Sequence, residues 1–431
     1  MSRLLLFLLA ILTTSAVAVT PEELQSLDLE RAVAMAYEAS EDIALSDNEI
    51  EKARLYRRQA LGGALPNISA EAKWSNFIEA PNFNGLSLNG KYETLGAVSV
   101  SQAIYNFGAL SSALRAAKEG EKAGRLSREA ALKEVEFATR LTYYTCLLAS
   151  RQLEIAKASL KNAEQNLKIL QDSFSQGRPP QGDLIQLKTD VASRRPTVLE
   201  AEAQLREAIL ALKQLLGVDY QTEIKLSTDF SESFPSYQRE KLQKGLGAQP
   251  KLLALKANIE LQSQLAEVES AKSLPSLGAF LSLQRNMQSQ SGIFSADRTL
   301  NTAVWGVQLK WNLWDGGTTS AKYRTAVAER GAAEITHRRE EEKAELDLAK
   351  NLSQYQTWRQ VYTDNKTALQ LARESFRLSQ NRFKSGKTSV TELNTVNRGL
   401  TQVELSTAVS LFKIHEAMAN LRRMTGLEVN P

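Results

Sequence analysis

From Ala303 to Leu313 every second residue is apolar and alternates with Val304, Gly306, Gln308, Lys310 and Asn312, and this pattern predicts a strand that ends in a turn. The apolar positions are Ala303, Trp305, Val307, Leu309, Trp311 and Leu313. Gln308, Lys310 and Asn312 lie between them, and a period of two indicates one apolar and one polar face. Such a strand suits a lipid-facing barrel wall around a polar lumen. It equally suits a one-sided sheet packed on a soluble core.

A very long helix is predicted after this strand. Between the turn Asp315-Gly316-Gly317 and Gly386 there is no proline and only one glycine, Gly331. The run is rich in Ala, Glu, Arg, Leu and Gln, which favour helix. As one helix it would have about 65 residues and a length of about 100 Å. Long helical patterns of this kind indicate a coiled coil, a helical repeat or a membrane span, and the many charges exclude the last.

The first half of the chain shows the same kinds of element in the same order. A helix is predicted from Leu29 to about Leu61, ended by Gly62-Gly63 and Pro66. Alternation then predicts one strand through Ile68 and Trp74, a polar loop over about 81–92, and a second strand through Val98 and Ile104.

A second long helical run follows these two strands. It extends without proline to about Gln176, and the loop 177–182 then reverses the chain. A return helix is predicted from Asp183 to Leu216. Pro196 lies inside it and should either kink the helix or mark a break, because proline removes one helical hydrogen bond.

The two halves are related by a constant offset of 209 residues, which indicates an internal duplication. Pro66 matches Pro275, and Gly217 matches Gly426. The same shift carries the apolar strand face of the first half onto that of the second, so register is preserved. We therefore expect a first repeat at 29–217, a joining segment at 218–247 and a second repeat at 248–427.

The N-terminus has the pattern of a secretory signal peptide. Arg3 precedes an apolar run from Leu4 to Leu12, which is too short to span a bilayer, and Ala16-Val17-Ala18 resembles a cleavage site. We expect residues 1–18 to be removed. No later apolar run reaches helical membrane-spanning length, so an exported chain of this type is either free outside the cytoplasm or inserted as a β-barrel.

Composition adds little specific chemistry. With 431 residues, 43% hydrophobic and 24% charged, the chain can bury a large core, and a net charge of +4 is too small to indicate nucleic-acid binding. Cys146 is the only cysteine, so no intramolecular disulfide is possible and core packing is its expected role. His337 and His415 have no companions at ligand spacing, so no metal site is expected.

No enzyme motif or cofactor site stands out. Gly386-Lys387-Thr388 imitates the end of a phosphate-binding loop, but the motif requires a glycine where Asn381 stands. A nucleophile elbow and a dinucleotide-binding glycine pattern are not evident either. We expect neither enzymatic activity nor a cofactor.

Two strands per repeat give four per chain, whereas membrane barrels are closed and begin at about eight strands. Insertion in a membrane therefore requires an oligomer. In each repeat both strands lead into helices at the same side, so the helices should project as one bundle from one end of the barrel. Such an assembly is a tube, and a tube serves the passage of solute.

At this level the sequence resembles the TolC-type outer-membrane efflux proteins. The resemblance covers about Leu29 to Leu427 and rests on the duplicated layout, the strand exits Asn106-Phe107-Gly108 and Trp314-Asp315-Gly316-Gly317, and the turns SFSQGRPPQGDL and RFKSGKTSVTEL. It implies a mixed fold: a twelve-stranded outer-membrane barrel joined to a periplasmic coiled-coil α-helical tunnel, both completed by a homotrimer. It also implies docking of a periplasmic adaptor protein, itself bound to an inner-membrane pump.

The resemblance suggests acidic gate residues just after the second tip turn. Glu392 occupies the first such position, and three copies around a narrow axis would attract cations and repel one another. Thr395 stands one helical turn on, which weakens the case for a second acidic ring. Asp183 is the counterpart of Glu392, but the usual aromatic hydroxyl partner is replaced by Phe383. Both acids also suit a helix cap or first turn.

Contact residues follow from the same layout. The expected adaptor-docking positions at the tips are Gly177, Arg178, Gly386, Lys387 and Thr388. The glycines are also explained by the turns alone. The expected aromatic contacts with outer-membrane lipid are Trp74, Trp305 and Trp311.

Three classes of function remain in competition. A passive export duct agrees best with the pattern, with drugs, metal ions and polypeptides all open as cargo. A structural periplasmic coiled-coil protein without transport activity would need the strands to form a small soluble sheet. A periplasmic enzyme would need a polar catalytic cluster that the sequence does not show.

Overall fold

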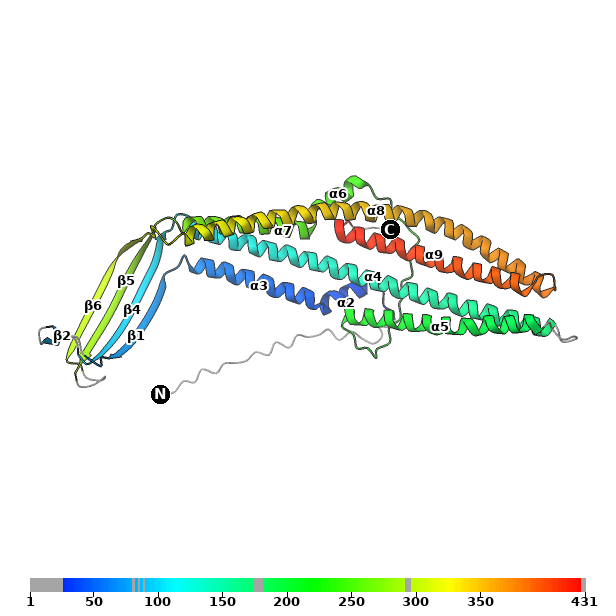
Figure 1. Ribbon diagram of the computed structural model, residues 1–431, viewed down its shortest axis with the longest axis horizontal. Helices are drawn as coiled ribbons and strands as arrows, with labels where there is room; N and C mark the ends of the chain where they lie inside the picture. The colour runs from blue at the N-terminus through cyan, green and yellow to red at the C-terminus, as the bar shows by residue number, and fades with distance from the viewer. Residues whose placement is uncertain are drawn as a thin grey trace.

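The computed structural model describes residues 26–79, 82–83, 86–87, 90–173, 181–290 and 296–427. These residues form a long rod with a β-sheet at one end and antiparallel helices along the rest of its length (Figure 1). The expected signal peptide and the tip residues Gly177 and Arg178 lie outside the described ranges. Within those ranges, no helix has the apolar length that crossing a membrane requires.

The main sheet is four-stranded and antiparallel, in the order β1-β4-β5-β6. Its strands are β1 (Asn67–Asn76), β4 (Tyr92–Tyr105), β5 (Ser276–Ser289) and β6 (Arg298–Lys310). All four predicted strands are confirmed, but the prediction that β6 continues to Leu313 is wrong, because the strand ends at Lys310. In the stretch expected to be a plain loop, β2 (Asn82–Phe83) and β3 (Leu86–Ser87) form a short ladder.

Two helices of unusual length carry the fold; both were predicted as long helices, and the second confirms the predicted length of about 65 residues. They are α4 (Ala109–Ser173), with 65 residues, and α8 (Thr318–Lys384), with 67. The return helices are α5 (Gln181–Leu216) and α9 (Val390–Thr425). Pro196 does not break α5, which runs through it as one helix.

The predicted single helix from Leu29 to Leu61 is wrong, since the structure has two helices there. They are α2 (Leu29–Ala39) and α3 (Glu41–Gly62), separated at Ser40. The backbone of Ser40 is extended, with φ −72° and ψ 116°, and its hydroxyl accepts a hydrogen bond from the Ile43 amide at 3.4 Å. An N-cap residue therefore starts a new helix inside a helical sequence pattern.

The second repeat contains the corresponding pair, α6 (Arg239–Gly247) and α7 (Pro250–Ala271). Helix α6 lies inside the segment expected to join the repeats. Helix α7 packs against both α4 and α8, whereas its counterpart α3 packs mainly against α4. One flank of α3 is therefore left without the long-helix neighbour that α7 has.

The duplication extends to the hydrogen-bond register of the strands. In the first hairpin Asn67 faces Ser101, and in the second Ser276 faces Lys310, each 209 residues further on. Both strand exits also use two successive left-handed residues. Phe107 (φ 49°) and Gly108 (φ 92°) correspond to Gly316 (φ 69°) and Gly317 (φ 86°). The turn geometry is thus kept even where a phenylalanine must adopt a conformation that favours glycine.

Three apolar cores lie along the helices. The first packs α2, α4, α5 and the beginning of the segment 218–238, which we call the connecting segment. The second packs α6, α8 and α9 with the end of the connecting segment, and the third packs the tips of α4, α5, α8 and α9. Buried tyrosines fasten the connecting segment, because the Thr228 amide donates to the Tyr143 hydroxyl at 3.2 Å and Tyr355 donates to the Pro235 carbonyl at 2.6 Å.

Candidate functional site

The turn between α8 and α9 is the described tip of the helical end. Gly386 has φ 69°, and its amide donates to the Phe383 carbonyl at 3.0 Å. Gly386 and Lys387 are exposed, whereas Thr388 is half-buried. The turn therefore needs its glycine for backbone geometry and presents Lys387 to solvent.

Glu392 lies exposed in the first turn of α9, close to this tip. Its amide donates to the Ser389 hydroxyl at 3.1 Å, so Ser389 rather than Glu392 is the N-cap. A groove of about 830 Å³ is lined in part by Glu392 and Lys387. Thr395 is also exposed, but its hydroxyl donates to the Thr391 carbonyl at 2.9 Å. The carboxylate of Glu392 is thus available at the tip.

Asp183 lies half-buried in the first turn of α5. One turn further on, the Gln186 side chain donates to the Thr391 hydroxyl at 3.3 Å and joins α5 to α9. Phe383 stands where the family resemblance leads us to expect an aromatic residue whose hydroxyl group bonds to Asp183. It packs into the apolar tip core at 8% exposure. The hydrogen bond between Gln186 of α5 and Thr391 of α9 therefore joins two neutral side chains.

A polar network that sequence reasoning missed joins three helices above the tips. Asp190 on α5 is 5% exposed and accepts from Arg194 Nε at 2.9 Å. Arg194 also donates to the Ser159 hydroxyl of α4, which lies 3.1 Å from the Thr401 hydroxyl of α9. We call Asp190, Arg194, Ser159 and Thr401 the tip network.

The tip network also reaches a cation of α9. Arg398 lies 3.8 Å from the Asp190 carboxylate, and its side chain is 71% exposed. The only sequence signal for this network was the spacing of Asp190 and Arg194, which suits an ion pair on one helix. Nothing in the sequence indicated that the pair would be buried between helices.

Several amides in the tip core have no hydrogen-bond partner among the described residues. Asn394 and Asn397 of α9 are 3% and 0% exposed, and both side-chain atoms of each are unpaired. The side-chain oxygen of Asn166 of α4 accepts from Gln380 of α8 at 3.3 Å, whereas its side-chain nitrogen has no partner among the described residues. Buried polar groups without partners destabilise the packing that buries them. The helical end therefore contains both the hydrogen bonds of the tip network and buried amides that destabilise its packing.

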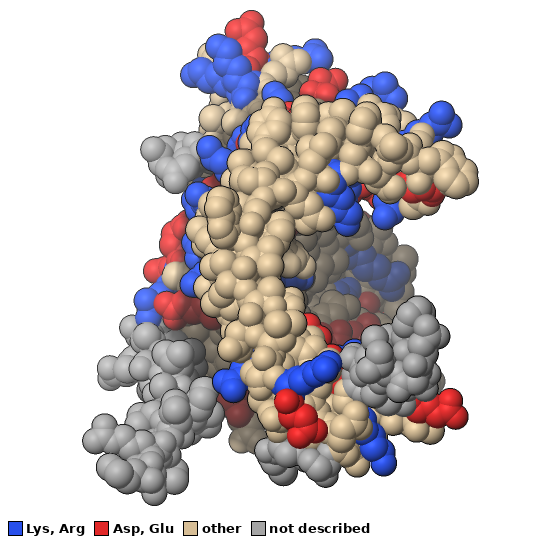
Figure 2. Space-filling view, turned by 90° about the vertical axis from the view of Figure 1, so that its left-hand side faces the viewer, with Lys and Arg blue, Asp and Glu red and all other residues tan. Residues whose placement is uncertain are grey.

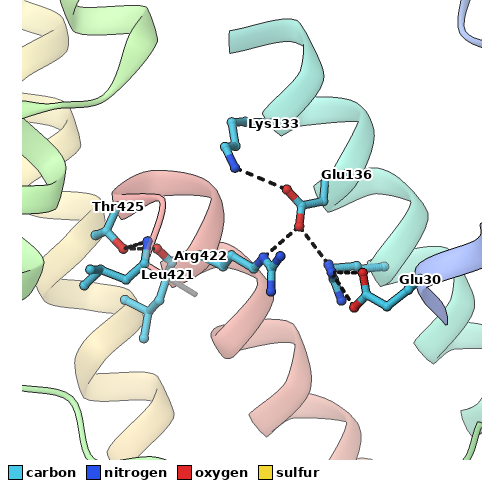
Figure 3. A network of polar contacts seen from close by, with 8 residues as sticks. Glu30, Lys133, Glu136, Leu421, Arg422 and Thr425 are labelled. Carbon is cyan, nitrogen blue, oxygen red and sulfur yellow. Dashed lines mark hydrogen bonds and ion pairs between the residues drawn. The ribbon is translucent and has the colours of Figure 1, made fainter. Parts of the chain in front are cut away.

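A second charged network ties the repeats together midway along the rod (Figure 3). Glu136 of α4 contacts Arg140 at 3.1 Å, Arg422 of α9 at 2.7 Å and Lys133 at 3.4 Å. Arg140 in turn binds Glu30 of α2 at 2.9 Å. We call these five residues the middle network.

The middle network lowers the pKa of its central acid, Glu136, and so favours the ionised carboxylate. Burial alone would raise the pKa of Glu136, but Arg422, Arg140 and Lys133 outweigh it and hold the pKa below its usual range. Glu136 and Arg140 are 5% and 6% exposed, so neither charge can be left without its partner at low cost.

One face of the sheet is apolar and exposed. Trp305 is 81% exposed, and Trp74, which stacks on Tyr92 at 6.3 Å, is 53% exposed. Trp311 lies just beyond β6 and donates to the Ser273 carbonyl at 3.2 Å. Trp314, which is not among the expected lipid contacts, is 85% exposed. Seen from the sheet end, uncharged side chains form a band through the centre, with charges at its sides (Figure 2).

The opposite face of the sheet is polar. Ser99 and Ser282 lie 3.3 Å apart across β4 and β5, and Asn286 donates to Glu93 at 2.6 Å. Glu71 and Lys310 belong to the same face by strand parity. A sheet with these two faces separates an apolar surrounding from water.

The histidines and the cysteine have surroundings of the packing type. Within the described ranges, no group of three or more His, Cys, Asp or Glu side chains is placed to hold a metal ion. His415 lies 2.9 Å from the Ser231 carbonyl and beside the stacked rings of Tyr144 and Phe230, and burial lowers its pKa. Burial raises the pKa of Cys146 to about 12, so its thiol is protonated and unreactive at neutral pH.

Comparison with known proteins agrees with this architecture. The chain is 22% identical over 328 residues to the alkaline protease secretion protein AprF of Pseudomonas aeruginosa, covering 73% of this chain and 64% of AprF. It is 23% identical over 392 residues to the pyoverdine export outer membrane protein OpmQ of Pseudomonas putida, covering 88% and 81%. The chain thus spans less than two thirds of AprF.

The fold is that of solved outer-membrane channels. The outer membrane protein VceC of Vibrio cholerae superposes with a TM-score of 0.80 at 15% identity, covering 92% of this chain and 96% of VceC. A model of the outer membrane efflux protein family matches residues 32–218 and 242–427, which are most of the chain and fall in both halves. The chain therefore belongs to the outer membrane efflux protein family.

Proposed function

We propose that this outer-membrane protein is the passive exit duct of a tripartite efflux or type I secretion system. The observation that carries the proposal is the incomplete sheet. One chain supplies a four-stranded sheet with one apolar and one polar face, and no strand within the described ranges pairs with the outer edge of β1 or β6. A bilayer tolerates only closed barrels, so closure requires further copies. Three copies would give twelve strands.

The helices support the same proposal. They extend the wall of the sheet into a rod with its tips far from the membrane end (Figure 1). A duct of this shape can span the space outside the inner membrane and receive solute there. The protein itself supplies a path, and the energy comes from an inner-membrane pump that it meets through a periplasmic adaptor.

Docking of the adaptor is assigned to the tips. Gly386 and Lys387 are exposed beside the groove that contains Glu392, and Thr388 completes the turn. Gly177 and Arg178 are their proposed equivalents in the first repeat. Cargo is left open, because AprF is named for protease secretion and OpmQ for pyoverdine export.

The proposal is tested by planar-bilayer conductance of the purified mature protein, with its oligomer mass determined in the same detergent. Discrete, long-lived conductance steps from a trimer are the expected result. A monomer that never inserts would overturn the proposal and favour a structural periplasmic coiled-coil protein.

Glu392→Ala is expected to lower cation selectivity and to weaken block by a multivalent cation applied from the helical end. Three symmetry-related carboxylates at a narrow axis attract such a cation, and each exposed carboxylate contributes about 0.5 kcal/mol. Block should weaken on the order of tenfold, which corresponds to about 1.4 kcal/mol. Single-channel recording with increasing concentrations of the cation measures both effects.

The matched control is Glu154→Ala, which removes an exposed acid of α4 that is already paired with Arg151 at 2.8 Å and does not line the groove that contains Glu392. This variant should leave block and selectivity as in the parent. Equal effects of the two variants would remove Glu392 from the gate without affecting the channel assignment.

A further inference from the structure

We propose that β1 of one copy pairs with β6 of the next in one defined register, with Glu71 directly opposite Lys310 of the neighbouring copy. The proposal rests on the proposed function, since it specifies how the copies of the duct join. It goes further by fixing which residues meet at the junction and by placing an ion pair between subunits on the polar face of the sheet.

The two strands involved form the open edges of the sheet (Figure 1). Among the described strands, β1 pairs with β4 alone and β6 pairs with β5 alone. Each edge therefore presents a row of backbone donors and acceptors that another strand can satisfy. In a membrane these groups must be paired, because lipid offers no hydrogen bonds.

The internal duplication supplies the register. The junction between the repeats is the pair β4 and β5, in which Ser101 faces Phe280. Strand β6 is the counterpart of β4, and β1 is the counterpart of β5, each by the shift of 209 residues. Moving both members of the junction by this shift places Lys310 opposite Glu71. The copies then meet as the two repeats meet within one chain.

The shift is accurate at the level of single hydrogen-bond pairs. The two hairpins of the sheet have identical registers after the shift, with Asn67 facing Ser101 and Ser276 facing Lys310. A sheet built twice with the same register inside each repeat is expected to keep one register between repeats as well. The faces agree too, because a slip by one residue would turn the apolar side chains of β6 to the polar side.

Charge selects this register over its neighbours. Directly opposite residues of antiparallel strands have side chains within about 5 Å of each other, and unlike charges there are favourable. In the proposed register the acid Glu71 meets the base Lys310. A slip by two residues in one direction would instead place Lys310 opposite Lys73, which is unfavourable. In the proposed register, Leu309 meets Ala72 on the apolar face.

The early end of β6 is explained by the same junction. Strand β4 has neighbours on both sides and continues to Tyr105, whose counterpart is Trp314. Strand β6 has only one neighbour and ends at Lys310. Beyond it, Leu313 and Trp314 are 76% and 85% exposed. In the proposed register the first residues of the neighbour's β1 lie beside this stretch and allow the strand to continue.

Disulfide trapping tests the register directly. The double variant with Ala72→Cys and Leu309→Cys places two thiols directly opposite each other across the junction, within the Cα separation that a disulfide accepts. The control with Ala70→Cys and Leu309→Cys is displaced by two residues, where the separation is about 7–8 Å and unfavourable. The native Cys146 is 0% exposed and does not compete.

The expected result is a covalent trimer in denaturing gel electrophoresis for the first pair after mild oxidation of the protein in membranes, and its loss for the control pair. Preferential cross-linking of the control pair would overturn the proposed register. Conductance measured on the same parent protein shows whether a negative result contradicts only the register or also the proposed duct. A conducting trimer with the other cross-link contradicts the register alone, whereas a protein that neither assembles nor conducts contradicts the duct as well.

A charge exchange tests the ion pair without new thiols. Glu71→Lys and Lys310→Glu each place like charges opposite each other at every junction, so each should lower the temperature at which the trimer dissociates in detergent. The double variant restores unlike charges and should recover that temperature. Additive losses in the double variant would overturn the pairing of Glu71 with Lys310, even if the trimer forms.

Discussion

Glu136→Ala is expected to destabilise the protein by about 3 kcal/mol, because it removes the common carboxylate partner of the buried Arg140 and the half-buried Arg422, and Arg140 keeps only Glu30. Glu136 contacts Arg140 at 3.1 Å and Arg422 at 2.7 Å. Arg140 is 8% exposed at its side chain, so water cannot replace the lost carboxylate. Unfolding by denaturant, followed by circular dichroism of the detergent-solubilised protein, measures the loss.

The matched control is Glu154→Ala. Glu154 pairs with Arg151 at 2.8 Å on the same helix, but both side chains are more than half exposed. Exposed pairs of this kind contribute about 0–1 kcal/mol. Equal losses for the two variants would show that the middle network contributes no more than a surface ion pair.

The same network predicts a pH dependence of stability. The pKa of Glu136 is held below its usual value of 4.5, against the effect of burial, by Arg422, Arg140 and Lys133. The unfolded chain therefore takes up a proton at this site before the folded protein does. Stability from Glu136 is fully present above pH 4.5 and is lost as the pH falls through the lower folded pKa. Glu136→Ala should flatten this part of the profile.

The sequence predicted the architecture because each element repeats a simple physical pattern. Alternation through Ile68 and Trp74 could only be satisfied by a strand with two different faces, and the structure has one at Asn67–Asn76. A run of 67 residues without proline gave one helix. Because one offset of 209 residues relates the two halves, each element assigned in one half predicted a matching element in the other.

Local errors occurred where tertiary context overrode the pattern. The alternation of β6 continues through Trp311 and Leu313, but a strand forms only where a neighbour supplies hydrogen bonds, and the chain alone offers none there. Ser40 interrupts a helical stretch because its extended backbone and hydroxyl start a new helix. An isolated serine inside a helical pattern does not show which of these states it will take.

The functional side chains were only partly accessible to the same reasoning. Glu392 could be placed at a helix start from its position after the turn, and the structure puts it in the first turn of α9. Asp190 could not, because its importance depends on Ser159 and Arg398, which lie on other helices. Long amphipathic helices show which face is buried, but they do not show which polar groups will meet within it.

The two networks have different roles at different places along the rod. The middle network joins α2, α4 and α9 through buried charges, so it fixes the relative position of the two repeats. The tip network joins α4, α5 and α9 in a region where Asn394 and Asn397 are buried without partners. Movement that separates the helix pairs is therefore easiest at the tips, with the middle network as the fixed point.

Asp190→Ala is accordingly expected to open the helical end of the duct. The packing of the tips would lose the hydrogen bond between Asp190 and Arg194 at 2.9 Å and would keep an Arg194 side chain that is 12% exposed. Leaving a buried charged group unpaired costs about 1–3 kcal/mol, which raises the open population by about 5–150-fold. Larger mean conductance in planar bilayers, with faster entry of a large solute through the helical end, measures this change.

The effect must be separated from general loss of structure. Glu154→Ala, which removes an exposed carboxylate on the neighbouring α4, should leave conductance at its parental value. Asp190→Ala should also keep the melting temperature close to that of the parent, because the middle network and the core that fastens the connecting segment are untouched. Higher conductance with unchanged melting assigns the tip network to closure of the duct. Lower melting with unchanged conductance would instead make Asp190 a packing residue with no role in closure.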